Sequence, residues 1–156
     1  MKVGRITLSD RASSGVYEDL SGPEIERVVR ECLIQDAHFV ARLLPDDQKS
    51  LEQTLCELTD ELDCALVITT GGTGPTLRDV TPEATRAVLH KELPGFGEIM
   101  RARNFERVPT AILSRATAGI RGQSLILNLP GNPRSIQQCL PFLSPAIHEC
   151  LQHIRS

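Results

Sequence analysis

The feature that most constrains the fold is a nearly continuous apolar run, CALVITT, over residues 64–70. A strand that is apolar on both faces is typical of a parallel sheet covered by helices on both sides. The run is followed at once by GGTG, and glycines allow the backbone to turn sharply after a strand. The stretch therefore predicts a buried strand whose carboxyl end opens into a loop.

Short apolar stretches alternate with amphipathic helical patterns along the rest of the chain. Strands are predicted at residues 3–9, 39–44, 117–121 and 124–129, the last two joined by a hairpin turn at Gly122-Gln123. Residues 10–20 are predicted to be a polar loop. Helices are predicted after an N-cap at Ser21, on the stripe Leu51, Leu55, Leu58 and Leu62, from Thr81 with Ala84, Ala87 and Val88 inward, over 95–107, and as two short stretches that finish the chain. This alternation predicts one α/β domain, residues 1–156, with a mostly parallel sheet and one antiparallel hairpin strand.

Composition narrows the functional classes. A formal net charge of -3 argues against general binding to nucleic acid or to an anionic membrane. The first residues, MKVGRITLSD, predict neither a signal peptide nor a membrane-spanning helix. Five scattered cysteines without a CxxC pair are most simply explained as small buried side chains of a reduced, cytoplasmic protein. The histidines have no metal-ligand spacing, so we expect oxygen ligands for any metal.

Polar residues collect where the predicted strands end. In open α/β sheets, ligands bind beyond the carboxyl ends of the strands. The four predicted loops at these ends are Ser9-Asp10-Arg11, Pro45-Asp46-Asp47, Thr70 to Asp79, and Leu129 to Arg134. Their composition predicts a single site at this edge of the sheet.

The glycine-rich loop, Gly71 to Gly74, matches neither standard nucleotide fingerprint. No Gly-Lys-Ser/Thr follows it, and Thr76 and Leu77 stand where the last glycine of GxGxxG belongs. The glycines alone are equally consistent with a tight strand-to-helix turn that binds nothing. The adjoining Arg78-Asp79 favours a site for a phosphate or a metal ion.

Two carboxylates, Asp46 and Asp79, directly follow predicted strand ends in separate loops. Mg²⁺ in proteins typically binds one or two carboxylates together with substrate phosphates. The alternative is that Asp46 or Asp47 caps the next helix while Asp79 supports its own loop. Asp10 has the same ambiguity.

Other polar residues of these loops have two interpretations as well. An arginine can bind a phosphate or an internal carboxylate, or it can be a solvated surface charge. Asn132, between two prolines, suits a polar contact with a ligand but also suits a turn. The arginines concerned are Arg11, Arg78, Arg115 and Arg134.

Four motifs carry a resemblance to a known family. They are SDRASSGVYEDLSG (Ser9 to Gly22), TTGGTGPTLRDVTPEAT (Thr69 to Thr85), PTAILSRATAGIR (Pro109 to Arg121) and LILNLPGNPRSI (Leu125 to Ile136). In this order they resemble the Mog-type molybdopterin adenylyltransferase family of molybdenum cofactor biosynthesis, over essentially the whole chain. Several relatives continue beyond the position of Ser156, so the resemblance does not extend to a C-terminal tail.

The resemblance implies a three-layer α/β/α fold and a homotrimer. It implies that molybdopterin reacts with Mg²⁺ and ATP to give adenylyl-molybdopterin and pyrophosphate. The product would pass to a separate molybdate-inserting protein.

The resemblance also implies roles for particular residues. Asp46 and Asp79 would be catalytic and would bind the metal. The residues implied to contact pterin or nucleotide are Ser9, Asp10, Gly71, Gly72, Thr73, Gly74, Ser114, Pro130, Gly131, Asn132 and Pro133. Only ILSR supports the assignment of Ser114.

Two other functions remain open at this point. A non-catalytic carrier of molybdopterin would keep the glycine-rich loop and the PGNP turn, but the presence of both Asp46 and Asp79 favours an enzyme. A structural scaffold has less support, because nothing in the sequence suggests a peptide-binding groove. Whether the final cofactor contains molybdenum or tungsten is also open.

Overall fold

The computed structural model describes all of residues 1–156. The strands are β1 (Lys2–Leu8), β2 (His38–Leu44), β3 (Leu66–Thr70), β4 (Lys91–Glu92), β5 (Ala118–Arg121) and β6 (Ser124–Leu129). The helices are α1 (Asp10–Ser13), α2 (Ser21–Cys32), α3 (Gln48–Cys56), α4 (Thr81–Val88), α5 (Gly95–Phe105) and α6 (Pro133–Ile154). A π-helical segment, η1 (Glu57–Glu61), extends α3, and a 3-10 helix, η2 (Pro109–Leu113), precedes β5.

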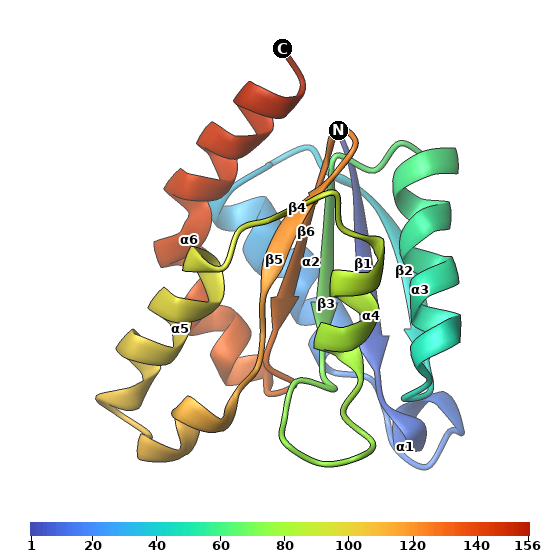
Figure 1. Ribbon diagram of the computed structural model, residues 1–156, viewed down its shortest axis with the longest axis vertical. Helices are drawn as coiled ribbons and strands as arrows, with labels where there is room; N and C mark the ends of the chain where they lie inside the picture. The colour runs from blue at the N-terminus through green and yellow to red at the C-terminus, as the bar shows by residue number, and fades with distance from the viewer.

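The strands form one six-stranded sheet in the order β2-β1-β3-β6-β5-β4, with helices on both faces (Figure 1). Strands β2, β1, β3 and β6 are parallel to one another, and β5 is antiparallel to β6. The predicted three-layer α/β fold is therefore confirmed. The edge strand β4, which pairs antiparallel with β5, was missing from the prediction because two exposed charged residues show no strand pattern.

Strand β3 lies at the centre of the sheet, and all of its residues are buried, as the apolar run predicted. On one face, α2 and α6 cover the sheet with side chains such as Ile25 and Ile136. On the other face, α3 and α4 contribute Leu51, Leu55 and Ala84. Full burial of one large aliphatic side chain stabilises the fold by about 1.5–3 kcal/mol, so both faces hold the central strands firmly in place.

The start of α2 differs from the prediction. Ser21 is the first helical residue rather than the N-cap, and the N-cap position, Leu20, makes no side-chain hydrogen bond. Instead, Asp19 Oδ1 accepts a hydrogen bond from the Gly22 N–H at 2.9 Å, and this carboxylate satisfies a free donor of the first turn. The preceding polar segment also contains the short helix α1, which Ser9 caps by accepting from the Ala12 N–H.

The C-terminal part is one helix of 22 residues rather than two short ones. The two interior prolines, Pro141 and Pro145, lie on its exposed face, and the Ser144 hydroxyl donates to the Pro141 carbonyl, which lacks a donor from Pro145. Burial of the opposite face against the sheet keeps the helix continuous. In α4, Ala84 and Val88 are buried as predicted, but Ala87 is exposed and Thr85 is buried in its place.

Helix α5 offers a matched pair of glycines for testing how closely it packs on β5. A Cβ atom at Gly97 would lie 2.1 Å from the Ala116 carbonyl oxygen, whereas a Cβ atom at Gly95 would meet nothing within 4 Å. We expect Gly97→Ala to lower the free energy of unfolding by about 1–3 kcal/mol, because backbone must move to admit the methyl group. Gly95→Ala should be neutral or slightly stabilising. Urea unfolding of both variants measures this, and equal stabilities would contradict the packing.

Candidate functional site

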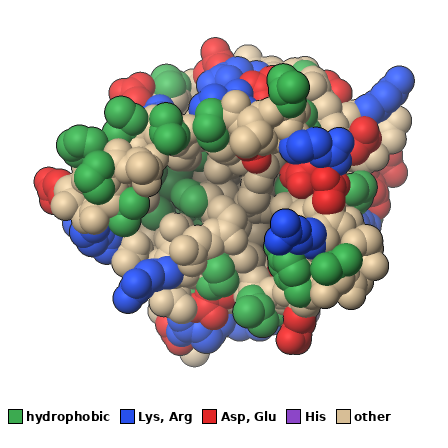
Figure 2. Space-filling model, turned by 90° about the horizontal axis from the view of Figure 1, so that it is seen from below, with side chains coloured by type: hydrophobic (Ala, Val, Ile, Leu, Met, Phe, Trp, Pro, Cys, Tyr) green, Lys and Arg blue, Asp and Glu red, His purple; other side chains and the backbone are tan.

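The carboxyl ends of four parallel strands meet at one edge of the sheet, at the bottom of Figure 1. In the register of these strands, Leu8 pairs with Leu44, Thr7 with Thr70, and Thr70 with Leu129. The four polar loops predicted from the sequence therefore leave the sheet side by side. Figure 2 shows this face from below, with a hollow in its middle and with acidic and basic side chains crowded along one rim.

Reciprocal hydrogen bonds join the loops that follow β1 and β2. The Asp46 N–H donates to Asp10 Oδ1 at 2.9 Å, and the Asp10 N–H donates to Asp46 Oδ2 at 3.3 Å. Arg78, from the glycine-rich loop, forms an ion pair with Asp10 Oδ2. Asp47, next in the chain, caps α3 by accepting from the Ser50 N–H, as one of the two interpretations predicted.

The two linked aspartates have opposite electrostatic surroundings. The hydrogen bond from the Asp46 N–H, followed by the Arg78 guanidinium, lowers the pKa of Asp10. Burial raises the pKa of Asp46, and the carboxylates of Asp10 and Asp79 raise it further. Asp46 is therefore a half-buried carboxylate whose negative charge is not fully compensated by the protein.

Asp79 closes the glycine-rich loop on itself. Its Oδ2 accepts hydrogen bonds from the Thr76 N–H at 3.0 Å and from the Thr76 hydroxyl at 2.7 Å. This confirms that Asp79 supports its loop, but Oδ1 makes no hydrogen bond and remains available. A Cβ atom on Gly74 would lie 2.8 Å from Asp79 Oδ2, and one on Gly72 would lie 3.2 Å from Asp46 Oδ1. Glycines therefore allow the loop backbone to pass directly beside both carboxylates.

Arg115 fixes this loop from the side of β5. Its N–H donates to the Thr73 carbonyl at 2.8 Å, and its guanidinium donates to the carbonyls of Gly74 and Asp79 at 2.8 and 2.9 Å. The same guanidinium pairs with Glu83 on α4. Arg115 therefore holds the loop from inside and binds an internal carboxylate, one of the roles considered for arginines here, and is not a solvated surface charge. The side chain of Thr73, within the loop, is buried and lines neither of the two cavities described below.

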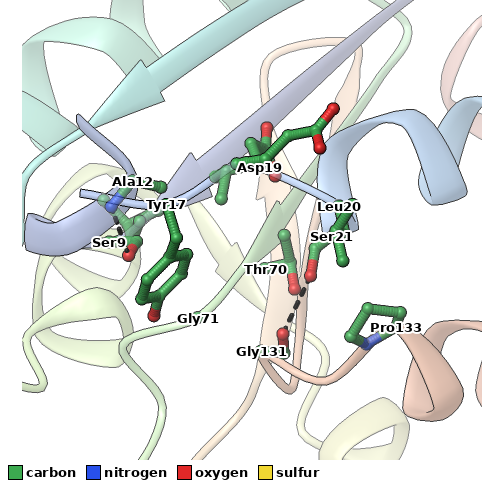
Figure 3. A pocket seen from close by; sticks show the side chains of 13 residues that line it. Ser9, Ala12, Tyr17, Asp19, Leu20, Ser21, Thr70, Gly71, Gly131 and Pro133 are labelled. Atoms are coloured by element: carbon green, nitrogen blue, oxygen red, sulfur yellow. Dashed lines mark hydrogen bonds between the residues drawn. The ribbon is translucent and has the colours of Figure 1, made fainter. Parts of the chain in front are cut away.

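A first cavity of about 370 Å³ lies between the α1–α2 segment, the end of β3 and the turn 130–133. Figure 3 shows Ser9 and Tyr17 at one end of it and Ser21, Gly131 and Pro133 at the other. The predicted residues Ser9, Gly71, Gly131 and Pro133 line this cavity. The sequence reasoning missed several lining residues: Thr7, Tyr17, Glu18, Asp19, Leu20, Ser21 and Thr70.

A second cavity of about 210 Å³ lies on the other side of the same turn, between α5, η2 and the start of α6. It contains the predicted residues Ser114, Pro130 and Asn132. Asn132 also caps α6, because its side-chain oxygen accepts from the Arg134 N–H at 2.9 Å. The turn 130–133 therefore forms a wall shared by both cavities.

Side chains of neighbouring elements hold this shared wall in place. The Thr70 hydroxyl donates to the Pro130 carbonyl at 2.7 Å, and the Ser21 hydroxyl donates to the Gly131 carbonyl at 2.9 Å. Serine at position 21, predicted to cap a helix, therefore connects α2 to the turn instead. Only the general polarity of its loop could have indicated this role, because the contact joins residues far apart in the sequence.

The predicted site residues thus fall into three adjoining groups. The first cavity and the second cavity flank the turn 130–133, and Asp10, Asp46, Asp79, Gly72 and Gly74 lie together where the glycine-rich loop meets the β1 and β2 loops. No cluster of three or more Asp, Glu, His or Cys side chains forms a ready-made metal site. Mg²⁺ does not require one, because one or two carboxylates with water and phosphate oxygens suffice.

Comparison with known proteins identifies the family. Residues 4–149 match the model of a family described as a probable molybdopterin binding domain. The chain belongs to this family. It is 53% identical to the molybdopterin adenylyltransferase of Helicobacter pylori strain J99, over 97% of this chain and 86% of that protein. It is 52% identical to the molybdopterin adenylyltransferase of Escherichia coli K12, over 98% of this chain and 78% of that protein.

Solved structures of related proteins confirm the fold of this chain. The Mog protein of Mycobacterium ulcerans is 35% identical, with a TM-score of 0.90 and coverage of 98% of each chain. The protein MoaB of Pyrococcus furiosus, described as tungsten cofactor synthesizing, is 36% identical, with a TM-score of 0.87 over 99% of this chain and 97% of that chain. None of the helices has the length and apolar character needed to cross a membrane.

The uncompensated charge of Asp46 predicts a pH-dependent cost to stability. Its pKa in the folded protein lies above the ordinary value of 3.8, so the ionised form is disfavoured by folding. We expect Asp46→Asn to raise the melting temperature at pH 7, by a free energy of at most about 1 kcal/mol because water screens the partly exposed charge. The gain should vanish as the pH falls below 3.8, where Asp46 is protonated in both states.

Calorimetry from pH 3 to pH 8 (roughly the range over which carboxylates titrate) measures this effect. Asp47→Asn is the matched control. A hydrogen bond from Ser50 lowers the pKa of Asp47, so this substitution should lower the melting temperature at pH 7 rather than raise it. A lower melting temperature for Asp46→Asn at pH 7 would contradict the electrostatic picture.

Proposed function

We propose that residues 1–156 act as one molybdopterin-binding domain with adenylyltransferase activity. The enzyme transfers AMP from ATP to the terminal phosphate of molybdopterin and releases pyrophosphate. The product, adenylyl-molybdopterin, serves later molybdate insertion in molybdenum cofactor biosynthesis. The observation that carries the proposal is the placement of Asp46 and Asp79 at the glycine-rich loop, at the same edge of the sheet as the two cavities. The two curated relatives described above, which are named for this activity, support it.

The reaction requires positioning and charge neutralisation more than covalent catalysis. An oxygen of the molybdopterin phosphate forms a bond to the α-phosphorus of ATP as the bond to the pyrophosphate oxygen breaks. Both reactants are anions, so their approach must be offset by hydrogen-bond donors and positive charge. In this proposal the backbone N–H groups of Gly72, Thr73 and Gly74 donate to phosphate oxygens, whereas the Gly71 N–H donates to the Leu129 carbonyl at 3.3 Å. The positive φ angles of Gly71 and Gly72, 93° and 68°, support a loop shaped for such contacts.

The donor set near Asp46 fits a magnesium ion. Asp46 Oδ1 and Asp79 Oδ1 accept no hydrogen bond. Burial, followed by the neighbouring carboxylates, raises the pKa of Asp46, and a bound cation would lower it. Asp46 and Asp79 would therefore hold Mg²⁺, which when bound neutralises the charge of the triphosphate. In this proposal the protein itself contributes carboxylates held at fixed positions by the Asp10 and Thr76 hydrogen bonds.

The remaining predicted residues position the substrates. Ser9 and the turn 130–133 line the first cavity, where they would contact the pterin or its phosphate arm. Ser114 would contact substrate from the second cavity. Asp10 would act indirectly, since it orients Asp46 through their reciprocal hydrogen bonds.

A non-catalytic carrier of molybdopterin is the alternative. Such a protein would need the cavities but not a half-buried carboxylate with uncompensated charge. The raised pKa of Asp46 is a cost to stability at neutral pH, and costs of this kind concentrate at catalytic and metal sites. This observation favours the enzyme.

We extend the proposal to assembly and location. The enzyme would be cytoplasmic and homotrimeric, and it would pass its product to a molybdate-inserting protein. Exposed apolar side chains on α5 and in and beside η2, namely Ile99, Phe105, Val108, Ile112 and Leu113, support a surface for self-association. Size-exclusion chromatography with light scattering would measure the mass of the assembly, and the mass of a monomer would contradict the proposed homotrimer.

Adenylyl transfer tests the central proposal. We expect wild-type protein incubated with molybdopterin, ATP and Mg²⁺ to form adenylyl-molybdopterin and pyrophosphate. Asp46→Asn and Asp79→Asn should each reduce the rate by about 100-fold or more, because an electrostatic contribution of this kind is worth roughly 3 kcal/mol. Asp47→Asn is the control, since an asparagine still caps α3.

Two results would contradict the proposal. Molybdopterin binding without pyrophosphate release from the wild type would show a carrier. Full activity of both Asp46→Asn and Asp79→Asn would show that these carboxylates have no catalytic role.

A further inference from the structure

We propose that the second cavity is an oxyanion subsite in which Arg101 and Arg107 bind a phosphate group of one of the two substrates. The inference rests on the proposed function for the identity of the ligand. The location of the subsite, and the class of ligand group that it binds, are argued from the charges and contacts of this cavity.

The two cavities have opposite charge. The first cavity is lined by two acidic residues, Glu18 and Asp19, and by no Lys or Arg. The second cavity is lined by two arginines and by no Asp or Glu. The cavities lie on opposite sides of the turn 130–133, so the two flanks of this turn differ in the charge of their side chains. An anionic group is favoured on the basic flank.

The arginines of the second cavity lack acidic partners. Other arginines near the site are neutralised: Arg5 pairs with Asp19 and Glu26, and Arg78 pairs with Asp10. Arg101 and Arg107 form no ion pair in the protein. Their positive charges are therefore available to a ligand.

Arg101 is held in place and still has free donors. Its Nη1 donates to the carbonyls of Ala116 and Ser114 at 2.9 and 3.3 Å, which fixes the guanidinium against the start of β5. Its Nε and Nη2 have no hydrogen-bond partner. A guanidinium that is anchored by one nitrogen loses little further freedom when the others bind a phosphate.

Arg107 is oriented from the same helix. Its Nη2 donates to Asn104 Oδ1 at 3.0 Å, and Asn104 in turn donates to the Cys139 sulfur at 3.4 Å. The side chains of Ser135 and Gln138, which line the cavity from α6, make no hydrogen bond and add neutral donors. Two guanidinium groups with hydroxyl and amide donors suit a phosphate-type oxyanion.

The subsite adjoins the machinery proposed above. Ser114 lines the cavity, and the next residue, Arg115, binds the carbonyls of Thr73, Gly74 and Asp79. A phosphate held in the second cavity therefore lies on the β5 side of the glycine-rich loop, whereas Asp46 lies on its β2 side. This arrangement gives a long polyanionic substrate, or a second substrate, an anchor separate from the carboxylates.

Binding of inorganic pyrophosphate to the ligand-free protein tests the subsite. We expect Arg107→Gln to weaken pyrophosphate binding in calorimetry by about tenfold, the effect of losing roughly 1.4 kcal/mol of charge-assisted contact. Arg101→Lys should weaken it as well, because lysine lacks the guanidinium fork. Arg103→Gln is the matched control: Arg103 lies on α5, as Arg101 does, but its guanidinium stacks over Phe142, 4.5 Å from the ring centroid, outside the cavity. The affinity of the Arg103→Gln variant for pyrophosphate should stay within about twofold of the wild-type value.

Amide spectra locate the ligand independently of affinity. Pyrophosphate in the second cavity should shift the amide signals of residues 104–111 and of Ser135. Shifts confined to residues 71–74, or equal affinities for Arg107→Gln and Arg103→Gln, would overturn the proposal.

Separate titrations with ATP and with molybdopterin identify the source of the phosphate. The substrate whose dissociation constant rises in Arg107→Gln is the one whose phosphate occupies the subsite. If neither constant rises while wild-type protein still transfers AMP, the subsite is wrong and the proposed function stands. If pyrophosphate binds as expected but no AMP is transferred, the proposed function is wrong and the subsite stands.

Discussion

The arrangement of the site depends on one buried side chain, Asn128 on β6. Its Nδ2 donates to the hydroxyls of Thr69 and Thr85 at 3.0 and 2.9 Å, and its Oδ1 accepts from the Thr117 N–H at 3.2 Å. It is fully buried, so each of these bonds forms where water cannot replace it. The amide thereby aligns β3, α4 and the segment that leads into β5. The glycine-rich loop connects the first two of these elements and is hydrogen-bonded to the third.

Alignment of these elements explains why a loop with so little apolar contact holds a defined shape. The loop leaves β3 at Thr70 and returns to α4 at Thr81, whose hydroxyl donates to the Gly71 carbonyl at 2.9 Å. Arg115, just before β5, binds the carbonyls along its middle. The N–H groups of Gly72, Thr73 and Gly74 make no internal hydrogen bond, so this part of the loop keeps its donors for a ligand. This division between carbonyls used internally and donors left outside is what an anion-binding loop requires.

Local patterns in the sequence predicted the parts of this structure that depend on local physics. The apolar run 64–70 predicted β3, and strand ends predicted which loops would meet, because parallel strands deliver their carboxyl ends to one edge. Helix α6 was predicted as two pieces, since proline breaks helices locally and only packing against the sheet shows that both prolines face outward. The roles of Ser21 and Arg115 depend on partners distant in the chain, so neither could be assigned without the fold.

The distribution of charge is the physical problem that this site solves. Joining two anions requires positive charge, yet three carboxylates, Asp10, Asp46 and Asp79, gather at the predicted reaction centre. The arginine beside them, Arg78, is already paired with Asp10. A permanently basic centre would bind any polyphosphate, with or without a metal ion. Under the proposed role of Mg²⁺, an acidic centre disfavours a bare polyphosphate and admits one that arrives with a cation, so recognition of the nucleotide would depend on the metal ion. In the proposed subsite, Arg101 and Arg107 would add affinity for the substrate at a distance from the carboxylates, without removing that condition.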